Sequence, residues 1–347
     1  MTELFWSGCY SPDLEGGGDG IGALRRRADG TLQYVGTAAE TASPSCLIQH
    51  PLLTDVLYAT LEGSGRLEGF RRTGSTTLTS LGSQPASGPF PCQGSVSADA
   101  RTLFTASYGD GSLGLVPLAQ DGSLGPPDKA LRFSGGGPHP HQDGPHGHAA
   151  LMIDESSLVS LDLGTDHVRL FEVSRGHDLR LLHTMALPPG SGPRDLLVHP
   201  GGLFYLLTEL SNEVFVLSRS ADRTRLSIVS STPLSPGSAP DVSNQPAGLS
   251  LSADGRFVYA GVRGDNVIAT LAVQDGGPRL ERVCEVPTGG DWPRHHLVDS
   301  QILYVCNQLS NTITCFSLDP RSGVPEPLGR PEPVPSPTFL LRAGSSA

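Results

Sequence analysis

The sequence predicts an all-β protein, a seven-bladed β-propeller with four-stranded antiparallel blades. Three observations support this fold. One phrase of short apolar strands recurs about every fifty residues, the chain carries 43 glycines and 30 prolines, and no long amphipathic helical pattern is present. A repeat of this period, built of short strands with many tight turns, is typical of propeller blades.

The repeated phrase has five parts in a fixed order. It consists of an apolar strand, a turn of the Ser-x-Asp-Gly type, a second apolar strand, a small polar or charged elbow and a third apolar strand. Its clearest copy is AGLSLSADGRFVYAGVRGDNVIATLAV, residues 247–273. The six internal copies begin near residues 46, 94, 148, 194, 247 and 295. Each copy is therefore interpreted as one blade.

The two ends of the chain predict a seventh, composite blade. Residues 4–10, 21–26 and 31–35 have the character of strands, and the apolar segment 338–342 has no partner of its own nearby. Pairing this C-terminal strand with the N-terminal strands would close the ring and leave no large open sheet edge.

The segments between the repeats indicate one domain. Stretches rich in glycine and proline at 135–145, 188–193 and 233–246 fall where connections between blades are expected. We therefore interpret residues 1–347 as a single β-propeller domain. A β-sandwich with a second domain is the alternative, but it does not explain the repeated phrase.

Composition excludes several classes of partner. The net charge of −11 and the absence of a basic run argue against nucleic acid. No apolar stretch reaches eighteen residues, and the start of the chain lacks a secretory signal pattern, so we expect no membrane association and a cytoplasmic location. The six cysteines form no CxxC pair and are interpreted as buried thiols. Charged faces on a closed ring favour a monomer.

Polar residues where several blades begin their inner strands are the best candidates for a site, because the inner strands of a propeller line its central channel. The loop GGGPHPHQDGPHGHAA contributes His146 and His148 at such an entry, after His139 and His141. A catalytic or substrate-binding histidine is favoured here. The alternatives are a histidine-rich surface loop and a metal site, but neither a cysteine nor a carboxylate clearly completes a ligand set, and no metal is predicted.

Four further candidates lie at corresponding positions of other blades. Arg194 in GSGPRDL and Arg294 in GGDWPR stand at inner-strand entries, and Glu209 and Arg263 follow the apolar runs of second strands. Guanidinium groups match carboxylate and phosphate as a fork, so the set favours a polyoxygenated anion. Trp292 is a candidate pocket wall. The alternative for Arg194 and Glu209 is a structural ion pair.

The same residues carry a resemblance to a known family. The chain resembles, over nearly its whole length, the seven-bladed lactonases, which include the propeller-type 6-phosphogluconolactonase and the 3-carboxy-cis,cis-muconate lactonizing enzyme. GGDWPR and GPHGH are the most specific matching motifs. The resemblance implies site residues at His146 or His148, Arg194, Glu209 and Arg263. It also implies Asn244, followed four residues later by an acidic residue, and here this chain departs from the family because it has Gly248.

The resulting expectation is the hydrolysis of a sugar lactone, most specifically 6-phosphogluconolactone in the pentose phosphate pathway. No Gly-x-Ser-x-Gly elbow is present, so direct attack by water is expected and no cofactor is required. His146 or His148 would be the general base and Arg194 would stabilise the oxyanion. Arg263 and Arg294 would hold the anionic group.

Two alternatives remain open on the sequence. The first is a muconate-type lactonizing reaction, in which the arginines grip a dicarboxylate. The second is a propeller that binds a metabolite or a protein without catalysis, which Gly248 favours, because a fold alone does not establish an activity.

Overall fold

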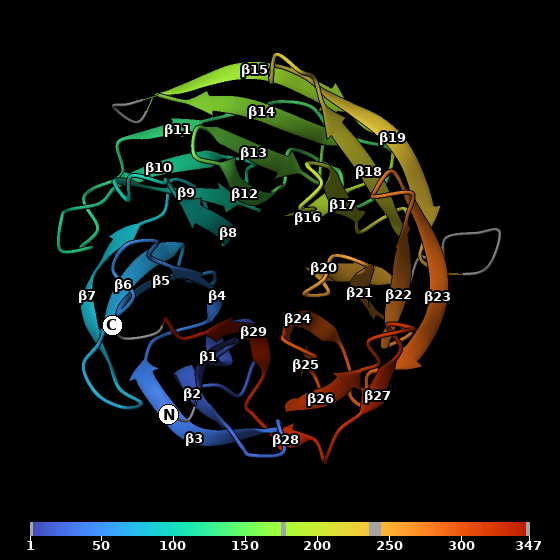
Figure 1. Cartoon of the computed structure of the whole chain (residues 1–347). Coiled ribbons are helices and arrows are strands. Elements are labelled where there is room, and N and C mark those ends of the chain that lie inside the picture. Colours follow the sequence, from blue (N-terminus) through green and yellow to red (C-terminus); the bar gives the residue numbers. More distant parts are fainter. Residues whose placement is uncertain (1–2, 175–177, 236–243, 345–347) are drawn as a thin grey trace.

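The structure is a computed structural model that describes residues 3–174, 178–235 and 244–344. Seven antiparallel sheets stand around a central axis like blades (Figure 1). The predicted seven-bladed propeller with four-stranded blades is confirmed. Part of the predicted connection at 233–246 lies outside the described residues, since 236–243 are not among them.

The blades are numbered from the composite one, each with its innermost strand first. Blade 1 consists of β29 (Pro337–Arg342), β1 (Leu4–Cys9), β2 (Gly20–Arg26) and β3 (Leu32–Glu40). Blade 2 consists of β4 (Pro44–Gln49), β5 (Val56–Leu61), β6 (Arg66–Arg72) and β7 (Leu78–Pro85). Blade 3 consists of β8 (Pro91–Val96), β9 (Thr102–Ser107), β10 (Leu113–Pro117) and β11 (Lys129–Leu131).

The remaining blades follow the same plan. Blade 4 consists of β12 (Gly147–Asp154), β13 (Ser157–Asp162), β14 (His167–Val173) and β15 (Leu179–Ala186). Blade 5 consists of β16 (Pro193–Val198), β17 (Phe204–Thr208), β18 (Glu213–Arg219) and β19 (Leu226–Pro233). Blade 6 consists of β20 (Gln245–Leu251), β21 (Phe257–Arg263), β22 (Val267–Gln274) and β23 (Arg279–Pro287). Blade 7 consists of β24 (Pro293–Asp299), β25 (Ile302–Asn307), β26 (Thr312–Leu318) and β27 (Pro325–Pro327), with β28 (Glu332–Pro333) also paired to β26.

The ring closes as the sequence predicted. The last strand of the chain, β29, pairs antiparallel with the first, β1, and becomes the innermost strand of blade 1. The pairing is visible in Figure 1 as a red strand set into a blue sheet. Because the two ends of the chain share one sheet, the ring closes through backbone hydrogen bonds as well as side-chain packing.

The core lies between neighbouring blades. Second strands are buried throughout in several blades, for example β5 and β13, because they face a blade on either side. Four blades add the same hydrogen bond, in which a tyrosine hydroxyl from the second strand donates to a glycine carbonyl in a turn of the next blade. The donors are Tyr58, Tyr205, Tyr259 and Tyr304, and the acceptors are Gly122, Gly277, Gly323 and Gly30.

Helices contribute almost nothing. Within the described part of the chain the one helical element is η1 (Pro12–Leu14), a single 3-10 turn. Among the same residues no helix has the length and apolar character needed to cross a bilayer. All six cysteines are free thiols, and four of them are buried.

Candidate active site

Every inner strand carries one extra residue near its start. In each blade the pairing with the second strand skips one position, which marks a β-bulge. The seven extra residues are Ser45, Cys92, His148, Arg194, Ala247, Arg294 and Thr338, and six of them follow a proline and one a glycine. A bulge leaves its residue unpaired and re-aims its side chain. All seven bulge residues line one cavity, so the bulges form a ring around the axis.

Three of the bulge residues are polar groups suited to catalysis: His148, Arg194 and Arg294. Around the same cavity lie Glu62, Gln93 and Asp195. With His295, the cavity therefore presents two imidazoles, two guanidiniums, two carboxyl groups and one amide, which come from five different blades.

Glu209 joins Arg194 to Arg263. Its Oε2 atom accepts a hydrogen bond from Nη1 of Arg194 and lies 3.0 Å from Nη2 of Arg263. Nε of Arg194 donates to the carbonyl of Ala247 at 2.9 Å, and Nε of Arg263 donates to the carbonyl of Gln245 at 2.7 Å. All three side chains are buried. Burial opposes ionisation of Glu209, but the two guanidiniums outweigh it and lower its pKa to about 2.

A second acid–arginine pair lies across the cavity. Glu62 follows β5 as Glu209 follows β17, and its Oε2 lies 3.6 Å from Nη2 of Arg294. The hydroxyl of Tyr10 donates to Oε1 of Glu62 at 2.9 Å and accepts a hydrogen bond from Arg294, whose guanidinium lies over the Tyr10 ring. Arg294 thus has a fixed position at the edge of the cavity.

His148 carries a neutral imidazole within this charged surrounding. It is 9% exposed, and burial, with the charge of Arg194 second, holds its pKa well below the usual 6.5. Nδ1 of His148 is buried without a partner among the described residues, and the ring meets the cavity.

His146, the other histidine candidate, does not line the cavity. Its ring stacks on Tyr108 with centroids 4.5 Å apart, and its nitrogens meet the carbonyl of Tyr108 at 2.7 Å and Oδ1 of Asp143 at 2.9 Å. Tyr108 also makes an edge contact with His148. Of the two alternatives, His148 has the better position, because the bulge falls on it and not on His146.

Three predicted substrate-binding residues also lie outside the cavity lining. Asn244 is buried and its side-chain amide brackets Asp265, accepting from its backbone N–H at 3.0 Å and donating to its carboxylate at 2.6 Å. The ring of Trp292 lies 5.2 Å from the guanidinium of Arg263. Arg263 itself is 4% exposed and engaged with Glu209. Arg263 reaches the site through Glu209, and Trp292 lies against Arg263, while the side-chain amide of Asn244 holds Asp265.

The most informative residue that the sequence reasoning missed is Asp195. It lines the cavity, and its carboxylate accepts hydrogen bonds from the backbone N–H groups of Leu249 and Leu196, both at 2.9 Å, with Nε2 of Gln93 at 3.5 Å. Burial raises its pKa. A Cβ atom on Gly248 would lie 3.8 Å from Oδ2 of Asp195. The carboxyl group therefore adjoins the position where the resemblance leads one to expect an acid.

The histidine loop shows no metal centre in the described residues. His139 and His141 contact each other with ring centroids 5.1 Å apart. Among residues 3–174, 178–235 and 244–344, no three His, Cys, Asp or Glu side chains are grouped as a metal ion requires.

Comparisons with known proteins agree with the geometry. A family model described as "Lactonase, 7-bladed beta-propeller" matches residues 5–342. A 6-phosphogluconolactonase of Bacillus subtilis is 30% identical over 332 residues, covering 92% of this chain and 94% of the relative. A periplasmic gluconolactonase of Pseudomonas aeruginosa superposes with a TM-score of 0.89 at 29% identity, covering 99% of this chain and all of that one. A protein from Lactobacillus plantarum superposes with a TM-score of 0.91 at 27% identity, covering 98% of this chain and 99% of the other.

Proposed function

Because the chain belongs to the seven-bladed β-propeller lactonase family, a family of enzymes, we propose that it hydrolyses 6-phosphogluconolactone to 6-phosphogluconate. The chain is a lactonase that acts on a sugar lactone, and the phosphorylated form of that substrate is what we propose. We further propose that it acts as a monomer in the cytoplasm on this small anionic substrate. The relative from Bacillus subtilis is named 6-phosphogluconolactonase, which supports this choice of substrate. The proposed reaction uses no cofactor.

The chemistry begins with a water molecule beside His148. The neutral imidazole takes a proton as the water oxygen bonds to the lactone carbonyl carbon, which gives a tetrahedral intermediate with a negative oxygen. Arg194 stabilises that oxygen by a charge-assisted hydrogen bond. The carbon–ring-oxygen bond then breaks, and the ring oxygen receives the proton held by His148. The products are the free acid and the regenerated imidazole.

The roles of the other residues follow from their contacts. Glu209 and Arg263 hold Arg194 in place from behind. Arg294 lines the cavity, and its described contacts are with the side chains of Glu62 and Tyr10. We assign the anionic group of the substrate to Arg294, and we assign Arg263 to positioning. Asp195, an acceptor that also lines the cavity, is assigned to a sugar hydroxyl.

The size of the cavity limits what enters it. Its volume is about 70 Å³, so the deepest part of the site is narrow. We place the reacting carbonyl and its neighbours in this space and the remainder of the sugar in the mouth of the channel. A phosphate at the far end of the sugar then lies outside the deepest part of the site.

The observation that carries the proposal is the convergence of His148 and Arg194 on one cavity through two equivalent bulges. Purified protein is expected to consume fresh δ-6-phosphogluconolactone faster than buffer, and Arg194→Ala is expected to remove most of the excess. Unphosphorylated δ-gluconolactone is the matched comparison for the phosphate. Equal rates with protein and with buffer, for both lactones, would contradict the proposal.

A muconate-type lactonizing reaction is the second candidate, because Arg194 and Arg294 both line the cavity and offer two cations to a dicarboxylate. Turnover of a carboxymuconate in the absence of sugar-lactone hydrolysis would favour it. A role in binding without catalysis does not fit a lactonase.

A further inference from the structure

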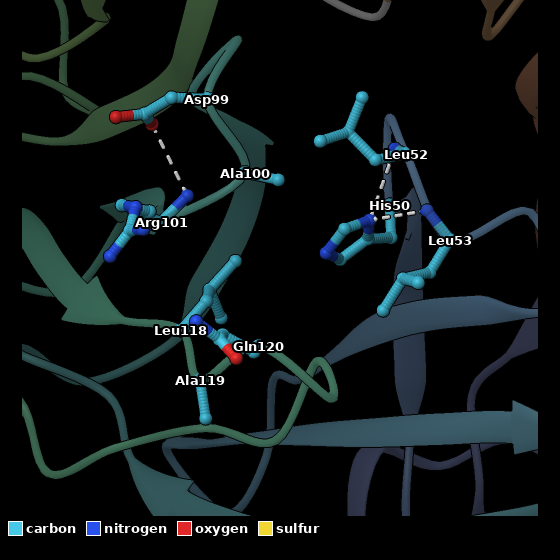
Figure 2. A pocket seen from close by; sticks show the side chains of 9 residues that line it. All are labelled: His50, Leu52, Leu53, Asp99, Ala100, Arg101, Leu118, Ala119 and Gln120. Atoms are coloured by element: carbon cyan, nitrogen blue, oxygen red, sulfur yellow. Dashed lines mark hydrogen bonds between the residues drawn. The ribbon is translucent and has the colours of Figure 1, made fainter.

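A larger cavity lies away from the active site, between blades 2 and 3. It encloses about 310 Å³, within the usual range of small-ligand pockets. His50, Leu52 and Leu53 line it from blade 2, and Ala100 and Leu118 line it from blade 3 (Figure 2). We call it the inter-blade pocket.

The inter-blade pocket is at the other end of the strands from the active site. His50 directly follows β4, whereas Ser45 near the start of β4 lines the active-site cavity. His50 is five positions after Ser45, which along an extended strand is roughly 17 Å. A ligand in the inter-blade pocket therefore does not contact the catalytic groups.

The imidazole of His50 offers a fixed hydrogen-bond donor to the inter-blade pocket. Nδ1 accepts two backbone hydrogen bonds, from Leu52 at 3.1 Å and from Leu53 at 2.8 Å. A nitrogen that accepts carries no proton, so the neutral ring has its hydrogen on Nε2. Figure 2 shows this second nitrogen on the side of the ring away from the two leucines, facing the cavity. His50 as a whole is 3% exposed, and its Nε2, which makes no hydrogen bond among the described residues, is not among the atoms closed off from solvent.

An equivalent histidine in blade 5 shows what the partner would be. His199 also precedes a proline at the end of an inner strand, and its Nδ1 accepts a hydrogen bond from the backbone N–H of Gly201. Its Nε2, however, is 3.1 Å from the carbonyl of Gly255, in the first turn of the next blade. In that pair of blades the turn closes onto the histidine.

Two sequence differences distinguish this pair of blades from blades 5 and 6. One is in the loop after the histidine, where Leu52 and Leu53 stand in place of Gly201 and Gly202, and the other is in the facing turn. The turn in blade 6 is Ser-Ala-Asp-Gly and the turn in blade 3 is Ser-Ala-Asp-Ala, so Ala100 stands where blade 6 has Gly255. A Cβ atom on Gly255 would lie 3.3 Å from Nε2 of His199, closer than an ordinary contact. Ala100 carries that carbon, at a φ of 57° that favours glycine. The same approach in blade 3 would bring this carbon tightly against the ring, so the Nε2–H of His50 is available to a ligand.

The chemistry of the lining restricts that ligand. Leucine side chains require an apolar body, which excludes a sugar acid, and the Nε2–H group requires an oxygen acceptor. Arg101 lies at the rim, while the Asp99 carboxylate beside it already accepts hydrogen bonds from the Ser97 hydroxyl and the Arg101 backbone N–H. We propose that the inter-blade pocket binds a small monocarboxylate with an apolar body, with the carboxylate oxygen on Nε2 of His50.

The test uses benzoate as the probe and benzylammonium, which has no acceptor, as the comparison. Titration of the whole protein, followed by calorimetry and by the NMR signals of the histidine rings, is expected to give saturable benzoate binding with a dissociation constant of about 1 mM or lower. His50→Gln is expected to weaken this binding at least about tenfold, because it removes the hydrogen bond to a charged group. His199→Gln is the matched control and should leave it unchanged.

Ala100→Gly provides an independent test. Glycine lets the turn approach His50 as in blade 6, so benzoate binding is lost, the melting temperature rises, and lactone hydrolysis is unchanged. Absence of saturable benzoate binding by the parent protein, equal binding of benzylammonium, or full binding by Ala100→Gly would each overturn the proposal. None of these outcomes bears on the lactonase activity, whose residues lie elsewhere.

Discussion

Oε2 of Glu209 lies 3.0 Å from Nη2 of Arg263 and also accepts a hydrogen bond from Nη1 of Arg194. One carboxylate thus holds two guanidiniums side by side in a buried place. Without it, like charges would repel in a medium of low dielectric, where such repulsion is strong. The orientation of Arg194 toward the cavity therefore depends on a residue that does not line the cavity.

Replacement of Glu209 by glutamine is expected to reduce both activity and stability. Breaking a buried ion pair typically costs about 3–5 kcal/mol, since the remaining charge stays buried. With Arg194 displaced, kcat is expected to fall about a hundredfold, the order lost with an oxyanion donor. Steady-state kinetics and urea unfolding measure the two effects. Glu281→Gln, at an exposed position on an outer strand, is the control; unchanged kcat in Glu209→Gln would contradict the positioning role.

The acid limb of the pH profile is expected to lie below pH 6.5. The base must be deprotonated to act, and burial with the nearby Arg194 charge lowers the pKa of His148. Activity should therefore persist as pH falls through 6.5 and be lost only further down. The measurement is kcat/KM against pH, with the spontaneous hydrolysis subtracted. His148→Gln should lower kcat about a hundredfold or more and abolish that limb; a limb centred at or above pH 6.5 would rule out His148 as the base.

Asp195→Asn is expected to act mainly on KM. The carboxylate is an acceptor on the cavity wall, and loss of one charged hydrogen bond to a substrate hydroxyl should raise KM about tenfold with a smaller change in kcat. Gly248→Ala is the matched control, because its new Cβ would lie at an ordinary 3.8 Å from its nearest neighbours. The reverse pattern, a large loss of kcat with KM unchanged, would make Asp195 the base in place of His148.

The fold was predictable from the sequence because nearly every blade of a propeller is formed by one continuous stretch of the chain. Strand alternation and turn residues recur with each blade, and β29 was recognisable as an apolar segment lacking a neighbour. Arg194 and His148 were also predictable, since each directly follows a proline or glycine at the start of an inner strand. The bulge at that point, which aims the side chain at the axis, is local in origin.

The rest of the site was not predictable because it depends on register between blades. Tyr10 belongs to blade 1 and Glu62 to blade 2, and the bulge residues of these two blades are uncharged. No charged residue at the start of their inner strands therefore draws attention to Tyr10 or Glu62 in the sequence. Asp195 is next to a bulge, and only the pairing of β16 with its neighbours shows that its side chain also reaches the cavity. Asn244 and Trp292 are close to site residues in the sequence, but they do not line the cavity. The side chain of Asn244 accepts a hydrogen bond from the backbone of Asp265, and the ring of Trp292 lies against Arg263.

His296 is expected to make the fold less stable in mild acid. Its Nε2 meets the carbonyl of Tyr259 at 3.1 Å, its Nδ1 is buried without a partner among the described residues, and burial lowers its pKa from 6.5 to about 4. Above pH 6.5 the ring is neutral in both the folded and the unfolded state. Below pH 6.5 the ring of His296 binds a proton in the unfolded chain but stays neutral in the folded chain, so the free energy of unfolding falls.

The fall is about 1.4 kcal/mol per pH unit for one such ring and ends near pH 4, where the folded ring also protonates, for a total of about 3 kcal/mol. Urea unfolding at pH 7.5 and pH 5.0 measures it. His296→Phe keeps the ring shape and removes the proton site, so the difference between the two pH values should shrink by about 2 kcal/mol. The lost hydrogen bond to Tyr259 affects both measurements alike and cancels. The exposed His141→Gln is the control, and an unchanged difference in His296→Phe would show that burial of this ring does not govern acid stability.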